Sequence, residues 1–535
     1  MITEYEYSQK VGFEHRKKFA QFFTPKCIAD FMAKWVVETQ NDASTILDPA
    51  FGLGVFSNSL YDINQNIKIV GYDVDDKILQ VAQSNFSLSK LISIYKQDYL
   101  TASWEDKFDG IICNPPYLKF HDYDNSLYIP YVNAHLNTNL NKFTNLYALF
   151  LLKSIYQLKK GGRLAYIIPT EFLNSDYGVE VKRILLKSNM LKHVIVINFQ
   201  EQPFDDALTT ASILLCENNQ ITEKVKFYTT NDFSKINIHT NEYKAFIPTE
   251  LDAQIKWKQY YGEINATKYI NLVPFNTFAK VSRGIATGAN KYFIFNNSKL
   301  KEFNLNNTQI IPCICHSKDI DTNIFTYDDF KKLACSDKDV YLFNGCKNED
   351  DEFVRKYIEF GEYQKINKRY LTANRKPWYS LENKKTAPIW VSVFNRKGLR
   401  FIRNEANVSN LTTFHSIHNI SKIETDVLFA YLLTNVAHEI LFDNSRQYGN
   451  GLIKFEPNDL NKGKIVDLAL LTTKEISYIK RLYNFIKISK DNGKELIELL
   501  NLFFTKKYTG TCYDIEQLLT DLNVLEKYNV RPNYK

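Results

Sequence analysis

The turn Asn114-Pro115-Pro116-Tyr117 carries the side chains in this sequence that are best suited to chemistry. It follows an apolar run at residues 108–113 that predicts a buried strand, which the prolines end because proline cannot donate a backbone hydrogen bond. The side-chain carbonyl of Asn114 and the backbone carbonyl of Pro115 are two acceptors for the hydrogens of a planar amine. An aromatic ring such as that of Tyr117 can stack on a base. The turn therefore predicts attack by a planar amine on an electrophile held beside it.

Three acidic residues end the three predicted strands that precede this turn, namely Asp48, Asp73 and Asp98. Since ligands of open α/β sheets bind at the carboxyl ends of the strands, we expect the three carboxylates to share one site. Gly52 and Gly54 follow the first strand and allow the backbone to approach a ligand closely. An acid before such a turn suits a cofactor with an ammonium group better than a pyrophosphate. In the same scheme Asp73 would bind ribose hydroxyls and Asp98 an adenine amino group.

The elements that position these residues alternate between strand and helix along residues 1–260. This alternation predicts a doubly wound, Rossmann-like α/β domain. Before the first strand, Thr24 followed by Pro25 predicts a helix that begins with threonine as the N-cap. A later helix from Asn145 is expected to end at the glycine pair at positions 161–162, just before the fifth strand.

The second half of the chain, residues 261–535, lacks this alternation and is predicted to form a separate, mixed α+β domain with a late helical tract near residues 473–507. It contains 40 Lys and Arg against 31 Asp and Glu, whereas residues 1–260 contain 27 against 29. A basic domain suits a polyanionic partner, although ordinary surface lysine accounts for the excess equally well. Basic residues among aromatic ones suit phosphate and base contacts, and the candidates are Arg283, Thr287, Arg396 and Arg446.

The eight cysteines are scattered through apolar runs, as expected for reduced thiols in the cytoplasm rather than for a disulfide framework. No apolar run approaches the roughly 20 residues of a membrane span, and the first residues do not resemble a secretion signal. The spacing of Cys313, Cys315 and His316 does not match a zinc site, so no metal is expected.

The order and spacing of these motifs along residues 14–217 resemble the amino-methylating, S-adenosylmethionine-dependent DNA methyltransferases, in the arrangement of the gamma class (TaqI-type adenine-N6 enzymes). The resemblance implies S-adenosylmethionine as the cofactor, held by Phe23, Thr24, Asp48, Ala50, Gly52, Gly54, Asp73, Val74, Asp98, Tyr99 and Phe150. It implies catalysis by Asn114, Pro115, Pro116, Tyr117 and Phe204, the last as the second aromatic residue around the target base. Many members of that family have a small or polar residue where this sequence has Leu53, and we expect no loss of function from this difference.

The function implied is site-specific methylation of N6 of a flipped adenine in double-stranded DNA. The enzyme would be a monomer, either the modification enzyme of a type II restriction–modification system with a separate endonuclease or a solitary methylase. Too few residues precede the first motif for a fused nuclease at the amino end. Alternatives are a glutamine, an RNA adenine or the N4 of cytosine as the substrate, and a non-enzymatic DNA-binding protein with a vestigial fold. The basic second half, Asn rather than Ser at position 114 and the complete set of acids favour the DNA adenine enzyme.

Overall fold

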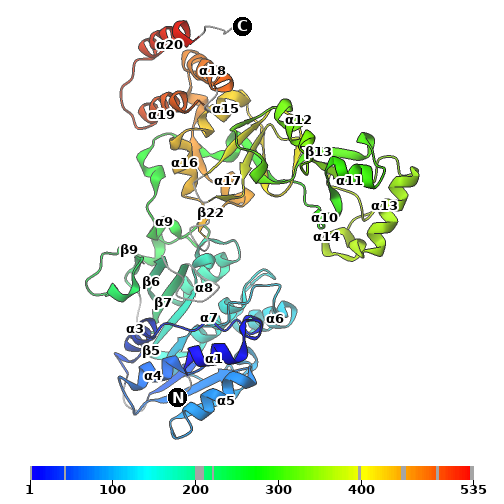
Figure 1. Cartoon of the computed structure of the whole chain (residues 1–535). Helices are drawn as coiled ribbons and strands as arrows, with labels where there is room; N and C mark the ends of the chain where they lie inside the picture. The colour runs from blue at the N-terminus through cyan, green and yellow to red at the C-terminus, as the bar shows by residue number, and fades with distance from the viewer. Residues whose placement is uncertain are drawn as a thin grey trace. The chain divides into compact units, whose positions relative to one another are not determined.

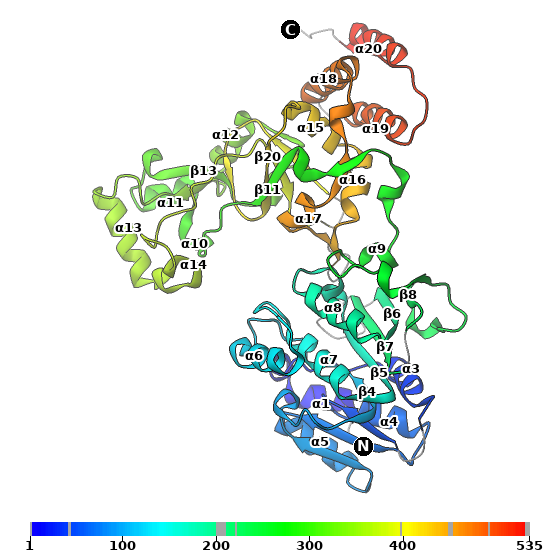
Figure 2. The same ribbon diagram turned by 180° about the vertical axis from the view of Figure 1, so that it is seen from behind.

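The computed structural model describes residues 3–40, 44–198, 210–219, 222–395, 399–447, 453–489 and 493–529. The chain divides into two compact units (Figures 1 and 2). The first comprises residues 1–263 together with 446–451, and the second comprises residues 264–445 and 452–535. Among the described helices, none combines the length and the apolar character that a membrane span requires.

The first unit is built on a sheet in which nine strands are described. In spatial order they are β3 (Ile92–Lys96), β2 (Lys68–Asp73), β1 (Thr45–Asp48), β4 (Phe108–Cys113), β5 (Leu158–Pro169), β7 (Thr210–Glu217), β6 (Leu191–Asn198), β8 (Val225–Thr230) and β9 (Lys244–Phe246). The strands from β3 to β5 are parallel neighbours, and β7 runs antiparallel between β5 and β6. The chain order reverses between β1 and β4, which is where an open sheet of this kind binds ligands. The predicted doubly wound α/β fold is confirmed.

Helices cover both faces of this sheet, and β4 shows how the sequence divides between them. Ile111 and Cys113 pack on one face, in a core shared with α7 (Leu146–Gln157), whereas Ile112 packs on the other with α3 (Lys26–Val37). Because successive strand residues point to opposite faces, a strand buried on both sides reads as a continuous apolar run. The remaining main helices of the unit are α4 (Val55–Tyr61), α5 (Asp76–Asn85), α6 (Asn125–Leu136) and α8 (Gly178–Ser188).

Two predicted boundaries are wrong. Helix α3 begins at Lys26 with Pro25 as its N-cap, and no side chain caps it, so Thr24 is not the N-cap. Helix α7 ends at Gln157, before the glycine pair, because Leu158 already pairs with Phe108 in the sheet. The register then shifts along β5, where Gly161 has a φ of +82°, so this glycine serves an irregularity in the strand rather than a helix end.

The second unit is mixed α+β, as predicted. Its main sheet runs in the order β11 (Ala279–Arg283), β20 (Phe414–Asn419), β16 (Ile389–Ser392), β18 (Phe401–Asn404) and β14 (Ile324–Phe325). The first four strands pair antiparallel, and β14 pairs parallel to β18. Apolar residues of this sheet share a core with α15 (Thr425–Leu432), α16 (Asn435–Phe442), α18 (Thr473–Ile488) and α19 (Lys494–Tyr508). The predicted late helical tract is therefore two helices. A separate aromatic core surrounds Tyr357 on α13 (Glu352–Tyr363).

Candidate active site

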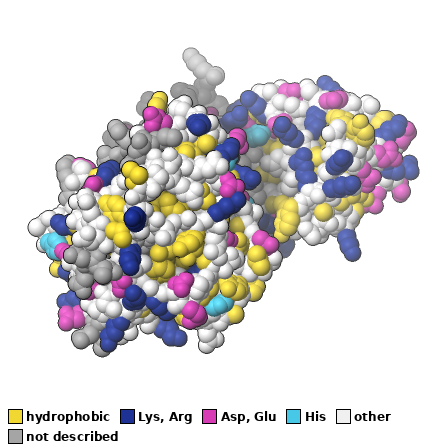
Figure 3. Space-filling model, turned by 90° about the horizontal axis from the view of Figure 1, so that it is seen from below, with side chains coloured by type: hydrophobic (Ala, Val, Ile, Leu, Met, Phe, Trp, Pro, Cys, Tyr) yellow, Lys and Arg dark blue, Asp and Glu magenta, His cyan; other side chains and the backbone are white. Residues whose placement is uncertain are grey.

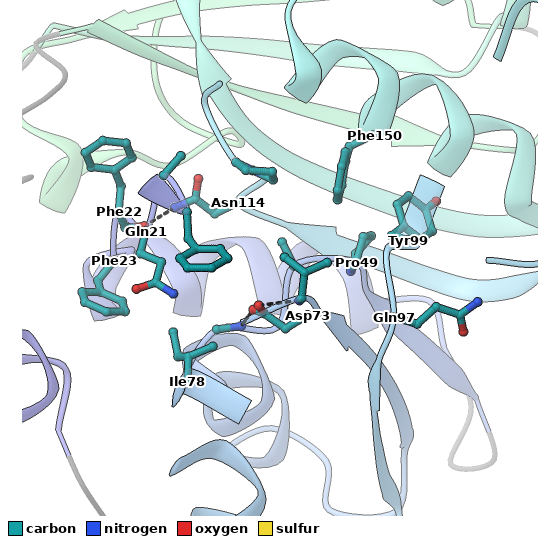
Figure 4. Close-up of a pocket in the computed structure, with 16 residues that line it drawn as sticks. Gln21, Phe22, Phe23, Pro49, Asp73, Ile78, Gln97, Tyr99, Asn114 and Phe150 are labelled. Carbon is teal, nitrogen blue, oxygen red and sulfur yellow. Dashed lines mark hydrogen bonds between the residues drawn. The ribbon is translucent and has the colours of Figure 1, made fainter. Parts of the chain in front are cut away.

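The carboxyl ends of β1, β2 and β4 meet at a cavity of about 110 Å³ in the first unit (Figure 4). Nine of the residues that the sequence predicted for the site line it, namely Phe23, Ala50, Gly52, Asp73, Val74, Tyr99, Asn114, Pro116 and Phe150. The lining residues that the sequence did not predict are Phe19, Ala20, Gln21, Phe22, Pro49, Ile78 and Gln97. Figure 4 shows Phe22 and Phe23 on the side of Asn114, with Tyr99 and Phe150 together on the other side.

The side-chain amide of Asn114 has a defined direction. Its Nδ2 donates to the backbone oxygen of Phe22 at 2.8 Å and to Oγ1 of Thr24 at 3.0 Å. Its Oδ1 is buried and has no hydrogen-bond partner among the described residues. A buried amide oxygen without a partner costs free energy, on the order of 1–3 kcal/mol. The amide thus presents an unused acceptor at the carboxyl end of β4.

The ring of Tyr117 is fixed beside this amide. Its hydroxyl donates to the backbone oxygen of Ile167 on β5 at 3.1 Å. The ring of Phe22 lies nearly parallel to it, with centroids 5.8 Å apart and an angle of 17° between the planes. One face of Tyr117 is therefore covered by an aromatic residue outside the predicted site. Phe204, the predicted second aromatic residue, lies outside the described residues.

Asp73 ties the end of β2 to the glycine turn. Its Oδ2 accepts from the N–H of Gly52 at 3.0 Å, and its Oδ1 accepts from the N–H groups of Val74 and Asp75 at 2.8 and 3.0 Å. Burial raises the pKa of Asp73, an effect that these backbone donors oppose. Gly54 does not line the cavity. It has a φ of +85°, and a Cβ there would meet the ring of Phe86 at 2.3 Å, so this glycine serves the fold of the turn.

Asp48 does not itself line the cavity. It is completely buried at the end of β1, next to Pro49 and Ala50, which do line it. Its Oδ1 accepts from the N–H of Ala50 at 3.3 Å, and its Oδ2 has no partner among the described groups. Burial raises the pKa of Asp48 to about 8, the Ala50 N–H opposes that rise and the nearby Asp73 adds to it. An unpartnered buried carboxyl of this kind fits a cationic ligand group, which would stabilise its ionised form.

Asp98 does not line the cavity, although its neighbours Gln97 and Tyr99 do. Its Oδ1 accepts from the N–H of Leu100 at 2.9 Å, and its Oδ2 accepts from the hydroxyl of Tyr128 on α6. Beneath this turn, the buried Lys153 donates to the backbone oxygen of Ala102 at 2.8 Å, and its burial lowers its pKa to about 7. The carboxylate thus holds a turn whose neighbouring residues reach the cavity.

Four of the seven unpredicted lining residues, at positions 19–22, belong to a segment at the amino end that one carboxylate anchors. Oδ2 of Asp75 accepts from Nε2 of Gln21 at 2.7 Å and from the hydroxyl of Tyr7 at 3.2 Å, and lies 2.8 Å from Nε2 of His15. Tyr7 belongs to α1 (Glu4–Val11), and His15 to α2 (Phe13–Lys18). These contacts hold residues 19–23 at the cavity. The closely spaced phenylalanines at positions 19, 22 and 23 were the sequence signal for this role.

The candidate DNA contacts lie in the second unit and at the 446–451 segment. The side chain of Arg283 on β11 is half exposed and pairs with Glu382 at 3.4 Å. Thr287 is buried, and its Oγ1 accepts from the N–H of Ala289 at 3.1 Å, so its placement favours a role in the turn rather than a DNA contact. Arg396 and the side chain of Arg446 lie outside the described residues. Within the described ranges, no group of His, Cys, Asp and Glu side chains is arranged to hold a metal ion.

Comparison with known proteins gives two family matches. Residues 3–281 match the family described as N-6 DNA Methylase, and residues 258–497 match that described as Type II methyltransferase M.Eco57I, C-terminal domain. The Type II methyltransferase M.AccI of Acinetobacter calcoaceticus is 54% identical over 523 residues, which cover 95% of this chain and 96% of that protein. The Type II methyltransferase M.XamI of Xanthomonas campestris pv. amaranthicola is 21% identical over 457 residues, which cover 83% and 85%.

Two solved structures share the fold. The DrdV–DNA complex matches with a TM-score of 0.56 at 11% identity, over 90% of this chain and 58% of that chain. The type IIL restriction-modification enzyme MmeI in complex with DNA matches with a TM-score of 0.54 at 12% identity, over 96% and 75%. At such identities the likeness concerns the fold alone.

Proposed function

The chain belongs to the N-6 DNA methylase family, and from that premise we propose that it methylates the N6 atom of an adenine flipped out of duplex DNA. The observation that carries this proposal is the direction of the Asn114 amide, whose Oδ1 is left without a partner at the cavity. Type II methyltransferases of restriction–modification systems are its relatives, which supports the role of a modification enzyme.

S-adenosylmethionine, the cofactor of this family, supplies an electrophilic methyl group on a sulfonium centre. The residues at the cavity fit such a ligand. We assign the ribose hydroxyls to Asp73 and the adenine ring to Tyr99 and Phe150, which line the cavity. We assign the ammonium group to the unpartnered carboxyl of Asp48, which lies behind the lining residues Pro49 and Ala50. Because Gly52 has no side chain, its backbone can lie close to the part of the cofactor that joins the ammonium group to the ribose.

At the catalytic turn, we assign to Oδ1 of Asn114 one hydrogen bond from the amine and to the backbone carbonyl of Pro115, which does not line the cavity, the second. Two acceptors draw the amine hydrogens to one side, so that the nitrogen lone pair points into the cavity. No strong base is required, because the proton can leave after the nitrogen has become cationic. Orientation supplies most of the rate enhancement in such a site. Since the Phe22 ring covers one face of Tyr117, a base that stacks on that face requires the ring to move aside.

The second unit is proposed to read the DNA sequence, since its residues fall within the match to the M.Eco57I C-terminal domain and carry the excess of positive charge. On the face of the molecule that Figure 3 shows, Lys and Arg side chains are interspersed with acidic ones. This face therefore gives no continuous basic patch that would mark a DNA-binding surface. Arg283 is the described candidate for a DNA contact, because its half-exposed guanidinium group can bind a phosphate.

The proposed product is tested by incubating the purified protein with duplex DNA and methyl-labelled S-adenosylmethionine, then analysing the nucleosides by mass spectrometry. We expect the label in N6-methyldeoxyadenosine. Label in N4-methyldeoxycytidine would move the reaction to cytosine. Parallel incubations with RNA and with a protein substrate test the alternatives: transfer to RNA or to a glutamine, with no label in DNA, would reject a DNA substrate.

The assignment of Asp48 predicts a pH dependence of cofactor binding. Its pKa of about 8 leaves the carboxyl mostly protonated at pH 6–7, and pairing with an ammonium group requires the ionised form. Below pH 8, cofactor binding should therefore release a proton from Asp48, and the affinity for the cofactor should rise by up to about tenfold per pH unit towards pH 8. Isothermal titration calorimetry between pH 6 and 8 measures this. The Asp48→Asn variant should bind more weakly and lose the rise, and a rise that persists in this variant would refute the assignment.

A further inference from the structure

We infer that Thr24, together with the backbone carbonyl of Phe22, sets the direction of the Asn114 amide, so that Thr24 is a positioning residue for methyl transfer. The inference rests on the proposed role of Asn114. It gives Thr24 a different task from the cofactor contact that the family resemblance implied.

The two acceptors distinguish the two possible orientations of the amide. Nδ2 of Asn114 uses one hydrogen on the Phe22 carbonyl and the other on Oγ1 of Thr24. If the amide turned over, Oδ1 would face the Phe22 carbonyl, which can only accept, and two lone pairs would oppose each other. The observed orientation therefore leaves Oδ1 as the atom for an incoming N–H donor.

The local structure explains why the Thr24 hydroxyl is available for this task. A threonine before a helical proline commonly caps the helix, but here Pro25 is the N-cap and no side chain caps α3. Thr24 is 2% exposed, so water does not compete for its hydroxyl. The hydroxyl is thus held by the start of α3 and directed to a residue 90 positions away in the sequence.

The Thr24 hydroxyl accepts from Asn114 at 3.0 Å, a contact that favours the positioning role over a cofactor contact. Phe22 and Phe23 line the cavity, whereas Thr24 does not. Removing the Thr24 hydroxyl should therefore alter the amide and leave the lining side chains in place. The same segment, anchored to Asp75 through Gln21, forms part of the cofactor cavity and holds the catalytic amide.

The test replaces Thr24 by valine, which keeps the shape and removes the acceptor, and by serine, which restores it. In the full-length protein, Thr24→Val should lower the single-turnover rate of methyl transfer at saturating cofactor and DNA by about 10–100-fold. The dissociation constants for S-adenosylmethionine and DNA should stay within about twofold. Thr24→Ser should recover the rate to within about threefold of the original chain. The control is Ser59→Ala, since Ser59 also has a buried hydroxyl but one without a partner, and its rate should be unchanged.

A second readout is independent of turnover. In the cofactor-free protein, the side-chain NH₂ signals of Asn114, identified by their loss in Asn114→Ala, should exchange with water at least about tenfold faster in Thr24→Val. An unchanged rate and unchanged exchange in Thr24→Val would overturn the positioning role. So would a cofactor dissociation constant raised more than tenfold with a normal rate at saturation, which would return Thr24 to cofactor binding. If the unmodified protein transfers no methyl group to adenine, it is the proposed function that fails, while the exchange measurement still tests the contact.

Discussion

Replacing Asn114 by alanine is expected to lower the single-turnover rate of methyl transfer by at least about a thousandfold. The variant removes the unpartnered Oδ1 that orients the amine, and no other described side chain at the cavity presents an amide oxygen in that place. Rapid-quench measurement determines this rate, with the enzyme and labelled S-adenosylmethionine in excess over the DNA duplex.

The same variant should still bind both ligands. The described hydrogen bonds of Asn114 go to Phe22 and Thr24, not to Asp48 or Asp73. Loss of its Nδ2 leaves the Phe22 carbonyl and the Thr24 hydroxyl without their donor, at a cost of about 1 kcal/mol each in stability. Cofactor and DNA dissociation constants should therefore change little. A rate close to that of the original chain would refute the role of Asn114, and a folded variant that binds no cofactor would assign it to cofactor binding instead.

Truncation after Glu263 is expected to abolish sequence-specific DNA binding. Affinity for the recognised duplex should fall by about a thousandfold or more, to the level of non-specific binding, because the proposed reading residues lie in the second unit. Competition between a recognised and an unrelated duplex in a fluorescence anisotropy titration measures the ratio.

Cofactor binding provides the control for this truncation. Every residue that lines the cavity lies before residue 151, within the retained part of the chain. The truncated protein should bind S-adenosylmethionine with nearly the original dissociation constant if it folds. A truncated protein that binds cofactor and still methylates the same DNA site would contradict the division of roles between the two units.

The features that the sequence predicted are those that short stretches encode. Local rules of strands and turns predict the apolar run before Asn114, the acids that end successive strands and the glycines after Asp48. In the structure these features meet at the carboxyl ends of neighbouring strands of one sheet. The fold class followed from the same patterns.

The features that the sequence missed depend on contacts between distant segments. Thr24 was predicted as a helix cap because it precedes Pro25, and only the proximity of Asn114 gives its hydroxyl another partner. Asp98 was predicted to contact adenine. Its carboxylate instead accepts from the hydroxyl of Tyr128, which lies 30 residues later in the sequence. Phe22 was overlooked because its parallel packing on Tyr117 arises only when the amino-terminal segment folds back.

Base-resolution mapping of methylated positions in the DNA of cells that express this protein tests the central claim most directly. The proposed function predicts N6-methyladenine at one fixed position of one recurring sequence, and its absence from cells that express Asn114→Ala. Modified cytosine at the recurring sequence, or no modified adenine when the intact protein is expressed, would contradict the claim that the Asn114 turn methylates adenine in DNA.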